Sequence, residues 1–255
     1  MNMTTFAQKD SWTNATIPFL FNRQIIEYDM KRAGLSLIKE YQLLPKEMIK
    51  KIESYRSKHE QDVIIGRMER TNKELVKAKK DAFAAAREQF YRLNDLEEMN
   101  IIDVRKDAIF VTRNCPHNKF GDYIEFRPKN VYSSFLRVGK RKIELFYRAP
   151  DIIDVKGIKD EIVPLHKDGM LTFFTIFIRK METGNTIDAI RYLRRMIDHY
   201  KNLELPLDYY REFDQGSSYR SIRNETAEEW WDDRVSELDI SYNYQILCRL
   251  AKILI

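Results

Sequence analysis

Residues 100–111 read NIIDVRKDAIFV, an apolar run that stops at the charged step 105–107 and then resumes. Short apolar runs rich in β-branched residues are typical of buried strands. Residues 24–34 (QIIEYDMKRAG) follow the same order, because an apolar run ends at an acidic residue and a helical pattern begins. The two stretches predict a sheet in which Asp29 and Asp107 are the residues where chemistry is expected.

Length and composition limit the class of protein. The chain has 255 residues, of which 44% are hydrophobic and 12% aromatic, which indicates a folded protein with one sizeable core or two smaller ones. Glycine (8) and proline (7) are scarce, which favours long helices joined to a few strands over a turn-rich sandwich. Cys115 and Cys248 form no CxxC pair, so we expect no disulfide scaffold or zinc ribbon. A cytoplasmic protein is therefore expected.

No apolar run reaches the ~18 residues that a membrane span requires, so no membrane association is expected. The chain also lacks the GxSxG, Walker A and GxGxxG motifs, which removes support for hydrolase, P-loop and dinucleotide-binding functions.

The charge of the chain is unevenly distributed. The net charge is +5, and residues 45–92 alone hold 13 Lys and Arg against 8 Asp and Glu. Residues 225–239 hold seven acids and one arginine. This pattern is compatible with a basic surface that faces nucleic acid, although two solvated helix faces would produce the same pattern.

The pattern predicts an α+β fold with a small mixed or antiparallel sheet, a long basic helical insertion and a helical C-terminal half. Residues 1–22 read as an irregular lead-in, residues 23–150 as the sheet with its insertion, and residues 151–255 as helical. Strands are expected at residues 23–28, 101–111, 122–126, 131–138 and 142–147, the last three as a meander that continues the same sheet. Helices are expected at residues 46–93, with a break near Gly66, and at 165–181, 186–200 and 242–255.

The basic helix carries a row of cations. Lys73, Lys77 and Lys80 share one face at helical spacing, and Arg87 extends that face. The apolar residues that form the opposite stripe are Leu75, Val76, Phe83, Ala86 and Phe90. A helix of this kind can lay cations along phosphates, so we expect it to bind nucleic acid. Lys140 and Arg141 form a basic hairpin tip that is a further candidate contact.

The sequence around Asp107, VRKDAIFV, resembles the strand–turn–strand motif of DNA polymerase palm domains, especially the A-family form. In that motif a metal-binding aspartate follows a basic residue and precedes apolar strand residues. The stretch IIEYDMKRAG around Asp29 is similar to the other palm motif, in which an aspartate ends a strand before a helix. The order aspartate, helical insertion, aspartate is also that of a palm interrupted by fingers. The resemblance covers about residues 23–148.

The resemblance implies that Asp29 and Asp107 bind Mg²⁺ for two-metal phosphoryl transfer, and that the basic helix contacts a triphosphate or template. The last helices would then act as a thumb-like clamp. The fingers signature is incomplete, because AAAREQFY supplies Arg87 and Tyr91 without the Tyr-Gly pair. The chain is therefore interpreted as a minimal polymerase-like protein, a polymerase subunit or a palm retained for binding.

A second class of function is a non-catalytic nucleic-acid-binding or assembly protein. The basic helix would bind nucleic acid, and Trp230 and Trp231, which lie among acidic residues, would dock a protein partner. The compact basic chain suggests a viral or mobile-element origin, which would place the protein in the host cytoplasm.

Overall fold

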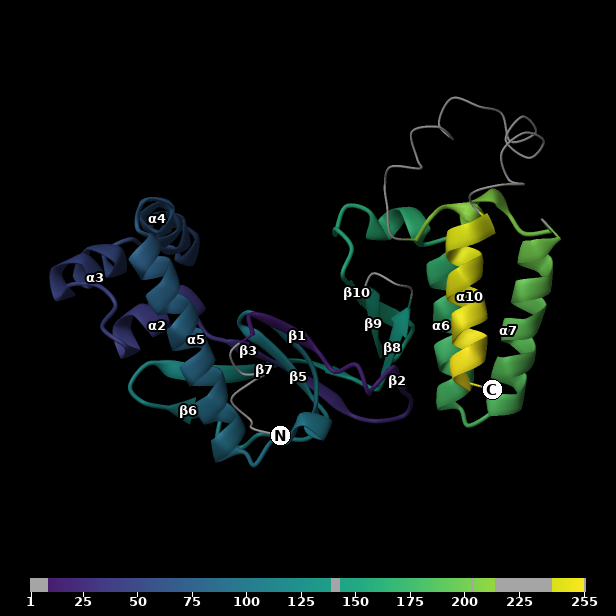
Figure 1. Ribbon diagram of the computed structural model, residues 1–255, viewed down its shortest axis with the longest axis horizontal. Coiled ribbons are helices and arrows are strands. Elements are labelled where there is room, and N and C mark those ends of the chain that lie inside the picture. The colour runs from purple at the N-terminus through teal and green to yellow at the C-terminus, as the bar shows by residue number, and fades with distance from the viewer. Residues whose placement is uncertain (1–8, 139–142, 203, 214–239, 255) are drawn as a thin grey trace, which may run out of the picture. The chain divides into compact units, whose positions relative to one another are not determined.

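The computed structural model describes residues 9–138, 143–202, 204–213 and 240–254 (Figure 1). These residues form two compact units. The first contains residues 9–17 and 25–131, and the second contains residues 18–24 and the described residues from 132 onward. The division falls after residue 131, whereas the sequence predicts it near residue 150.

The first unit is a six-stranded antiparallel sheet with helices packed on one face. In spatial order its strands are β1 (Ser11–Thr13), β4 (Ile101–Arg105), β5 (Ala108–Val111), β3 (Ile25–Met30), β7 (Ile124–Tyr132) and β6 (Lys119–Phe120). The segment between β3 and β4 holds α2 (Ala33–Glu40), α3 (Lys46–Glu53), α4 (Lys58–Thr71), α5 (Lys73–Leu93) and the short 3-10 helix η1 (Glu98–Asn100). The predicted α+β class is confirmed.

Strand β3 begins and ends two residues later than predicted. Because it ends at Met30, Asp29 lies inside the strand rather than beyond its end. Side chains alternate between the two faces of a strand. Ile26, Tyr28 and Met30 belong to the core beneath the helices, where Phe90 of α5 packs 5.4 Å from the Tyr28 ring. Asp29 therefore points to the face that is opposite the helices.

The predicted helical segment 46–93 is three helices, and the breaks are not at Gly66, which lies inside α4. Helix α4 begins at a capping box, in which Ser57 and Glu60 bond each other's backbone amides. Helix α5 begins where the Asn72 side chain accepts a 3.0 Å hydrogen bond from the Leu75 amide. The polar caps therefore set the boundaries, and the single glycine is tolerated.

The apolar stripe of α5 differs from the predicted one at Val76, which is 46% exposed. Leu75, Ala86 and Phe90 are buried as predicted. The Phe90 ring also lies 4.6 Å from the ring of Phe126 in β7. Phe90 thus joins α5 to the sheet at two strands.

Residues 101–111 form a hairpin rather than the one interrupted strand that the sequence predicts. Strands β4 and β5 pair in antiparallel fashion, with Arg105 opposite Ala108. Lys106 and Asp107 form the turn between them, and Lys106 adopts a positive φ of 48°. Two-residue hairpins require such left-handed conformations, so the charged step is where the chain reverses.

Only the first strand of the predicted meander, which is β7, continues the first sheet, and the other two strands belong to a second sheet. The second unit has its own antiparallel sheet, in the order β10 (Ile152–Lys156), β9 (Ile143–Arg148), β8 (Ser134–Val138) and β2 (Phe19–Leu20). Only Ser133 separates β7 from β8, and one residue is too short for a hairpin turn, so β8 pairs with β9 and β2 instead. Residues 1–22, which the sequence predicts as an irregular lead-in, supply β1 to the first sheet and β2 to the second.

In the second unit, helix α7 (Thr186–Lys201) packs against both α6 (Met170–Glu182) and α10 (Ile240–Leu254). The unit also contains two 3-10 helices, η2 (Val163–His166) and η3 (Leu207–Tyr210). Helix α6 starts five residues later than predicted, because η2 occupies the first part of the predicted segment. Helix α7 starts as predicted, where the Asn185 side chain accepts a 3.2 Å hydrogen bond from the Asp188 amide. Among the described residues, no helix has the length and apolar character to cross a membrane.

Candidate metal and phosphate site

The structure brings Asp29 and Asp107 together at one end of the first sheet. Strand β3 pairs with β5 in antiparallel fashion, and Asp29 lies opposite Ala108. The next backbone contact joins the turn to the strand, because the Met30 amide donates a 2.9 Å hydrogen bond to the Asp107 carbonyl oxygen. The two side chains are close enough for the negative charge of Asp107 to raise the pKa of Asp29. The two aspartates come from sequence positions 78 residues apart (107 − 29).

A lysine and a buried glutamate complete the surroundings of Asp29. The Lys129 ammonium of β7 lies 3.9 Å from Asp29 Oδ1 and 3.5 Å from Glu27 Oε1. Glu27 is buried, and its Oε2 accepts a 2.6 Å hydrogen bond from the Asn130 side chain. The Asp29 side chain keeps 28% of its surface exposed, so a small ligand can still approach it.

The pKa of the Asp29 carboxyl group is raised above its ordinary value. Burial is the largest cause, and the negative charges of Asp107 and Glu27 raise the pKa further, whereas Lys129 and Lys58 lower it. The carboxylate is thus less stable here than in water, even with two lysines nearby. A divalent cation would reverse this balance, because its charge favours the ionised form.

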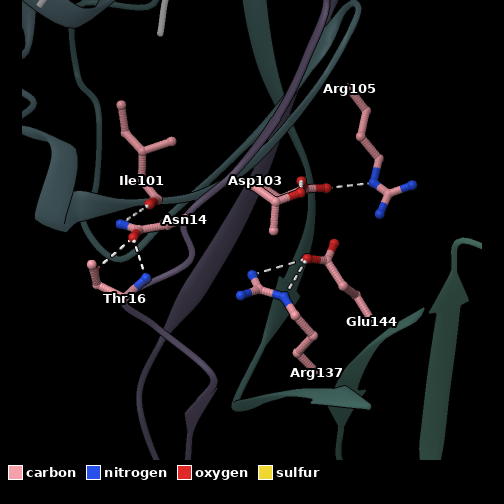
Figure 2. A network of polar contacts seen from close by, with 8 residues as sticks. Asn14, Thr16, Ile101, Asp103, Arg105, Arg137 and Glu144 are labelled. Carbon is pink, nitrogen blue, oxygen red and sulfur yellow. Dashed lines mark hydrogen bonds and ion pairs between the residues drawn. The ribbon is translucent and has the colours of Figure 1, made fainter. Parts of the chain in front are cut away.

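A second acidic group on the sheet is already occupied by protein partners. Asp103 of β4 is fully buried, accepts a 2.9 Å hydrogen bond from the Thr13 hydroxyl and forms an ion pair with Arg105. Figure 2 shows the Arg105 side chain directed at the Asp103 carboxylate. Nearby, Asn14, which directly follows β1, donates a 3.1 Å hydrogen bond to the carbonyl oxygen of Ile101, the first residue of β4 (Figure 2). This bond fixes the end of β1 against the start of β4. Asp103 therefore stabilises the sheet, and its carboxylate is not accessible to a metal ion.

Asp29 and Asp107 supply only some of the oxygen ligands that Mg²⁺ requires. Among the residues that the structure describes, no group of three or more His, Cys, Asp or Glu side chains is arranged to hold a metal ion. Magnesium bound through one or two carboxylates takes its other ligands from water and substrate phosphates. Asp29 and Asp107 therefore fit a magnesium ion that arrives with phosphate, and do not form a site of protein ligands alone.

The predicted lysine face is present on α5. Lys73, Lys77 and Lys80 are all exposed. The Lys80 ammonium lies 3.7 Å from Asp10 Oδ2, and Asp10 in turn accepts a hydrogen bond from the Lys106 amide through its carbonyl oxygen. Asp10 therefore connects Lys80, the last residue of the lysine face, with the turn that carries Asp107.

Arg87 does not belong to this exposed face. Its side chain is fully buried, and its Nη1 donates a 2.8 Å hydrogen bond to the Lys106 carbonyl oxygen. Arg87 lies seven positions after Lys80, which is helical spacing, but the sheet packs against the C-terminal half of α5, where Ala86 and Phe90 join its core. The prediction that Arg87 contacts a phosphate is therefore corrected.

Four of the predicted contact residues lie outside the described part of the chain. They are Lys140, Arg141, Trp230 and Trp231.

Residues that the sequence analysis missed also line a cleft of about 500 Å³ in the first unit. Its cationic lining residues are Lys31, Arg32, Lys39 and Lys119, and its acidic ones are Glu53, Asp122 and Glu125. Lys31 and Lys119 both lie within ion-pair distance of Glu125, at 3.0 and 3.4 Å, and they lower its pKa. The basic pair directly after Met30 was the sequence signal for this cleft. Glu27 and Lys129 were also missed, although the alternation of IIEYDM places Glu27 on the same face as Asp29.

The whole chain, residues 1–255, matches the family model described as Bacteriophage PBS1 gene 130 protein. The chain belongs to this family. The family takes its name from a bacteriophage, which agrees with the predicted viral origin. No curated protein matches the chain.

Proposed function

We propose that this member of the gene 130 family is a palm-like nucleotidyltransferase, or a subunit of one, that acts on nucleic acid with Mg²⁺. One observation carries the proposal, namely that Asp29 and Asp107 lie at the joined ends of β3 and β5. Two-metal phosphoryl transfer uses ions ~3.5–4 Å apart, so the carboxylates that hold them have to lie close together, as residues at adjoining strand ends can.

The order of elements around the two aspartates supports the same function. Strand β3 is followed by four helices and then by the β4–β5 hairpin, which is the order that the resemblance to palm domains implies. Asp29 also faces away from the helices, and its side chain keeps 28% of its surface exposed, so a substrate phosphate can approach it. The exposed lysines of α5 provide cations for the nucleic-acid backbone near this end.

Each residue has a defined task in this proposal. Asp29 and Asp107 hold the cation against substrate phosphates, and the cation supplies charge stabilisation to the transferring phosphoryl group. Lys129 balances the charge of Glu27 and Asp29, at 3.5 and 3.9 Å, until the cation and phosphates bind. Lys73, Lys77 and Lys80 position the strand.

A second candidate function is nucleic-acid binding without catalysis. Two observations favour it: no described group of three acidic or metal-binding side chains forms a metal site, and Lys129 already balances the charge of Asp29. In this case the lysine face of α5 binds nucleic acid, and Trp230 and Trp231 bind a protein partner. Both functions place the protein in the cytoplasm of the phage's host.

An incorporation assay separates the two functions. The full chain is incubated with a primed template, nucleoside triphosphates and Mg²⁺, alone and with other phage proteins. Asp29→Ala and Asp107→Ala should each abolish incorporation, whereas the lysine variants should change affinity for the template. Activity that survives in both aspartate variants contradicts the roles proposed for Asp29 and Asp107, whereas an inactive wild-type chain supports the binding function instead.

A further inference from the structure

Arg87 is an unusual side chain for the middle of an apolar helix face. It is fully buried, while its neighbours on the same stripe, Ala86 and Phe90, are apolar. Burial lowers the pKa of the guanidinium group, and Tyr91 and then Asp10 partly offset this shift. A buried cation is costly unless it is hydrogen-bonded, so its contacts are informative.

The contacts of Arg87 converge on the turn that carries Asp107. Nη1 donates a 2.8 Å hydrogen bond to the Lys106 carbonyl oxygen, and Nη2 lies 3.8 Å from Asp10 Oδ1. The Lys106 amide donates a 2.7 Å hydrogen bond to the Asp10 carbonyl oxygen. Helix α5 and the segment at Asp10 thus hold the two peptide groups that flank the Lys106 Cα atom.

The turn needs this support because of its own backbone. Lys106 has a positive φ of 48°, a conformation that costs energy for any residue with a Cβ. The third contact, from the Met30 amide to the Asp107 carbonyl oxygen at 2.9 Å, depends on the turn remaining in this conformation. A shift of the turn would move Asp107 away from Asp29.

We infer that Arg87 is a positioning residue, which fixes the turn at Lys106 and thereby holds the Asp107 carboxylate beside Asp29. The placement of the turn is a structural statement, whereas its importance for catalysis rests on the proposed function. Arg87 acts through the turn and contacts no substrate. This role also explains why a cation occupies a position that packing alone would give to an apolar residue.

Amide hydrogen exchange tests the positioning role without an activity assay. In Arg87→Met, the Met30 and Lys106 amides should exchange at least about tenfold faster than in the wild-type protein. The Ile26 and Tyr28 amides, farther back along β3, should keep their wild-type rates. Arg87→Lys, which keeps a donor, should recover part of the protection. A uniform acceleration of all four amides, or unchanged rates at Met30 and Lys106, overturns the inference.

Asp10→Asn provides a second route if Arg87→Met does not fold. Asp10 is 44% exposed, so this variant perturbs the core little, yet it weakens the partner of Arg87. The Lys106 amide should again lose protection, by a smaller factor. Lys80→Met is the matched control, because Lys80 pairs with Asp10 from the surface. Equal exchange in Asp10→Asn and the wild-type protein also overturns the inference.

The salt dependence of nucleic-acid binding separates positioning from phosphate contact. Arg87→Lys and Arg87→Met should leave the slope of log affinity against log salt unchanged, because a buried guanidinium releases no counterion. If the slope flattens, Arg87 contacts phosphate and the positioning role is wrong. If the exchange rates change as expected but the wild-type chain shows no incorporation, the positioning role stands and the proposed catalysis fails.

Discussion

The Met30 amide and the Asp107 carbonyl oxygen are joined by a 2.9 Å hydrogen bond, which ties the end of β3 to the turn of the β4–β5 hairpin. The bond extends the β3–β5 ladder by one step beyond Asp29 and Ala108. Two acidic residues that are far apart in sequence are thereby held at one place. The raised pKa of Asp29, to which Asp107 contributes, is the electrostatic consequence.

Asp29→Asn is expected to stabilise the protein at neutral pH. An acid whose pKa is raised by folding keeps its proton to a higher pH in the folded state, so stability falls as the pH rises through the folded pKa. Asparagine does not titrate and escapes this loss. Thermal unfolding should therefore give a higher midpoint for the variant at pH 7, and the difference should vanish below the ordinary Asp pKa of 3.8. A lower midpoint for the variant at pH 7 would contradict the raised pKa.

Charge reversal of the lysine face should weaken nucleic-acid binding. The triple variant Lys73→Glu, Lys77→Glu and Lys80→Glu should flatten the salt slope for duplex DNA by about 0.9 for each phosphate contact that is lost. Lys80→Gln is measured separately, because Lys80 also pairs with Asp10.

A matched control for this variant uses three exposed lysines of the second unit, with Lys159, Lys167 and Lys201 each changed to Glu. Both triple variants change the net charge equally. If both weaken binding to the same extent, general charge rather than the face of α5 is responsible.

Phe90→Ala should lower the free energy of unfolding by about 3–5 kcal/mol. The Phe90 ring is fully buried and packs against Tyr28 and Phe126, so its removal leaves a cavity between α5 and the sheet. Val76→Ala on the same helix should change the free energy by about 0.5 kcal/mol or less, because Val76 is exposed. Urea denaturation of both variants gives the comparison, and equal losses would argue against this packing of α5.

Gly121→Ala should destabilise the first unit by more than about 1 kcal/mol. Gly121 has a φ of +61°, and an added Cβ would lie 2.1 Å from Glu40 Oε1. Glu40 Oε2 accepts hydrogen bonds from the amides of Asp122 and Tyr123, at 2.9 and 2.8 Å. In a Glu40→Ala background the clash disappears and only the cost of the positive φ remains. The glycine substitution should therefore cost less in that background, as measured by urea denaturation.

Local patterns in the sequence were sufficient to predict the class of fold. The apolar runs around Asp29 and Asp107 are strands of one sheet, and the helical spacing at residues 186–200 corresponds to α7. These elements were predictable because burial imposes a period of two on strands and 3.6 on helices. The positions of the helix breaks at Ser57 and Asn72 depend on capping hydrogen bonds, which outweighed the expected effect of Gly66.

Tertiary packing decided what the sequence left open. Arg87 continues the spacing of the exposed lysines, but the sheet beneath α5 buries it. Spacing along a helix defines which residues share a face, and says nothing about where a neighbouring element begins to cover that face. The charged step at residues 105–107 became a turn because β5 folds back to pair with β4, which is a property of two strands together.

The most direct test of the central claim is a binding measurement on Asp29 and Asp107 together. Mn²⁺ binding in the presence of a nucleoside triphosphate is followed by paramagnetic resonance, for the wild-type chain, Asp29→Asn, Asp107→Asn and the double variant. If the two carboxylates share one ion with phosphate, each single variant should bind at least about tenfold more weakly, and the double variant should bind little more weakly than either. Independent, additive losses, or variants that bind as well as the wild-type chain, would contradict a shared site.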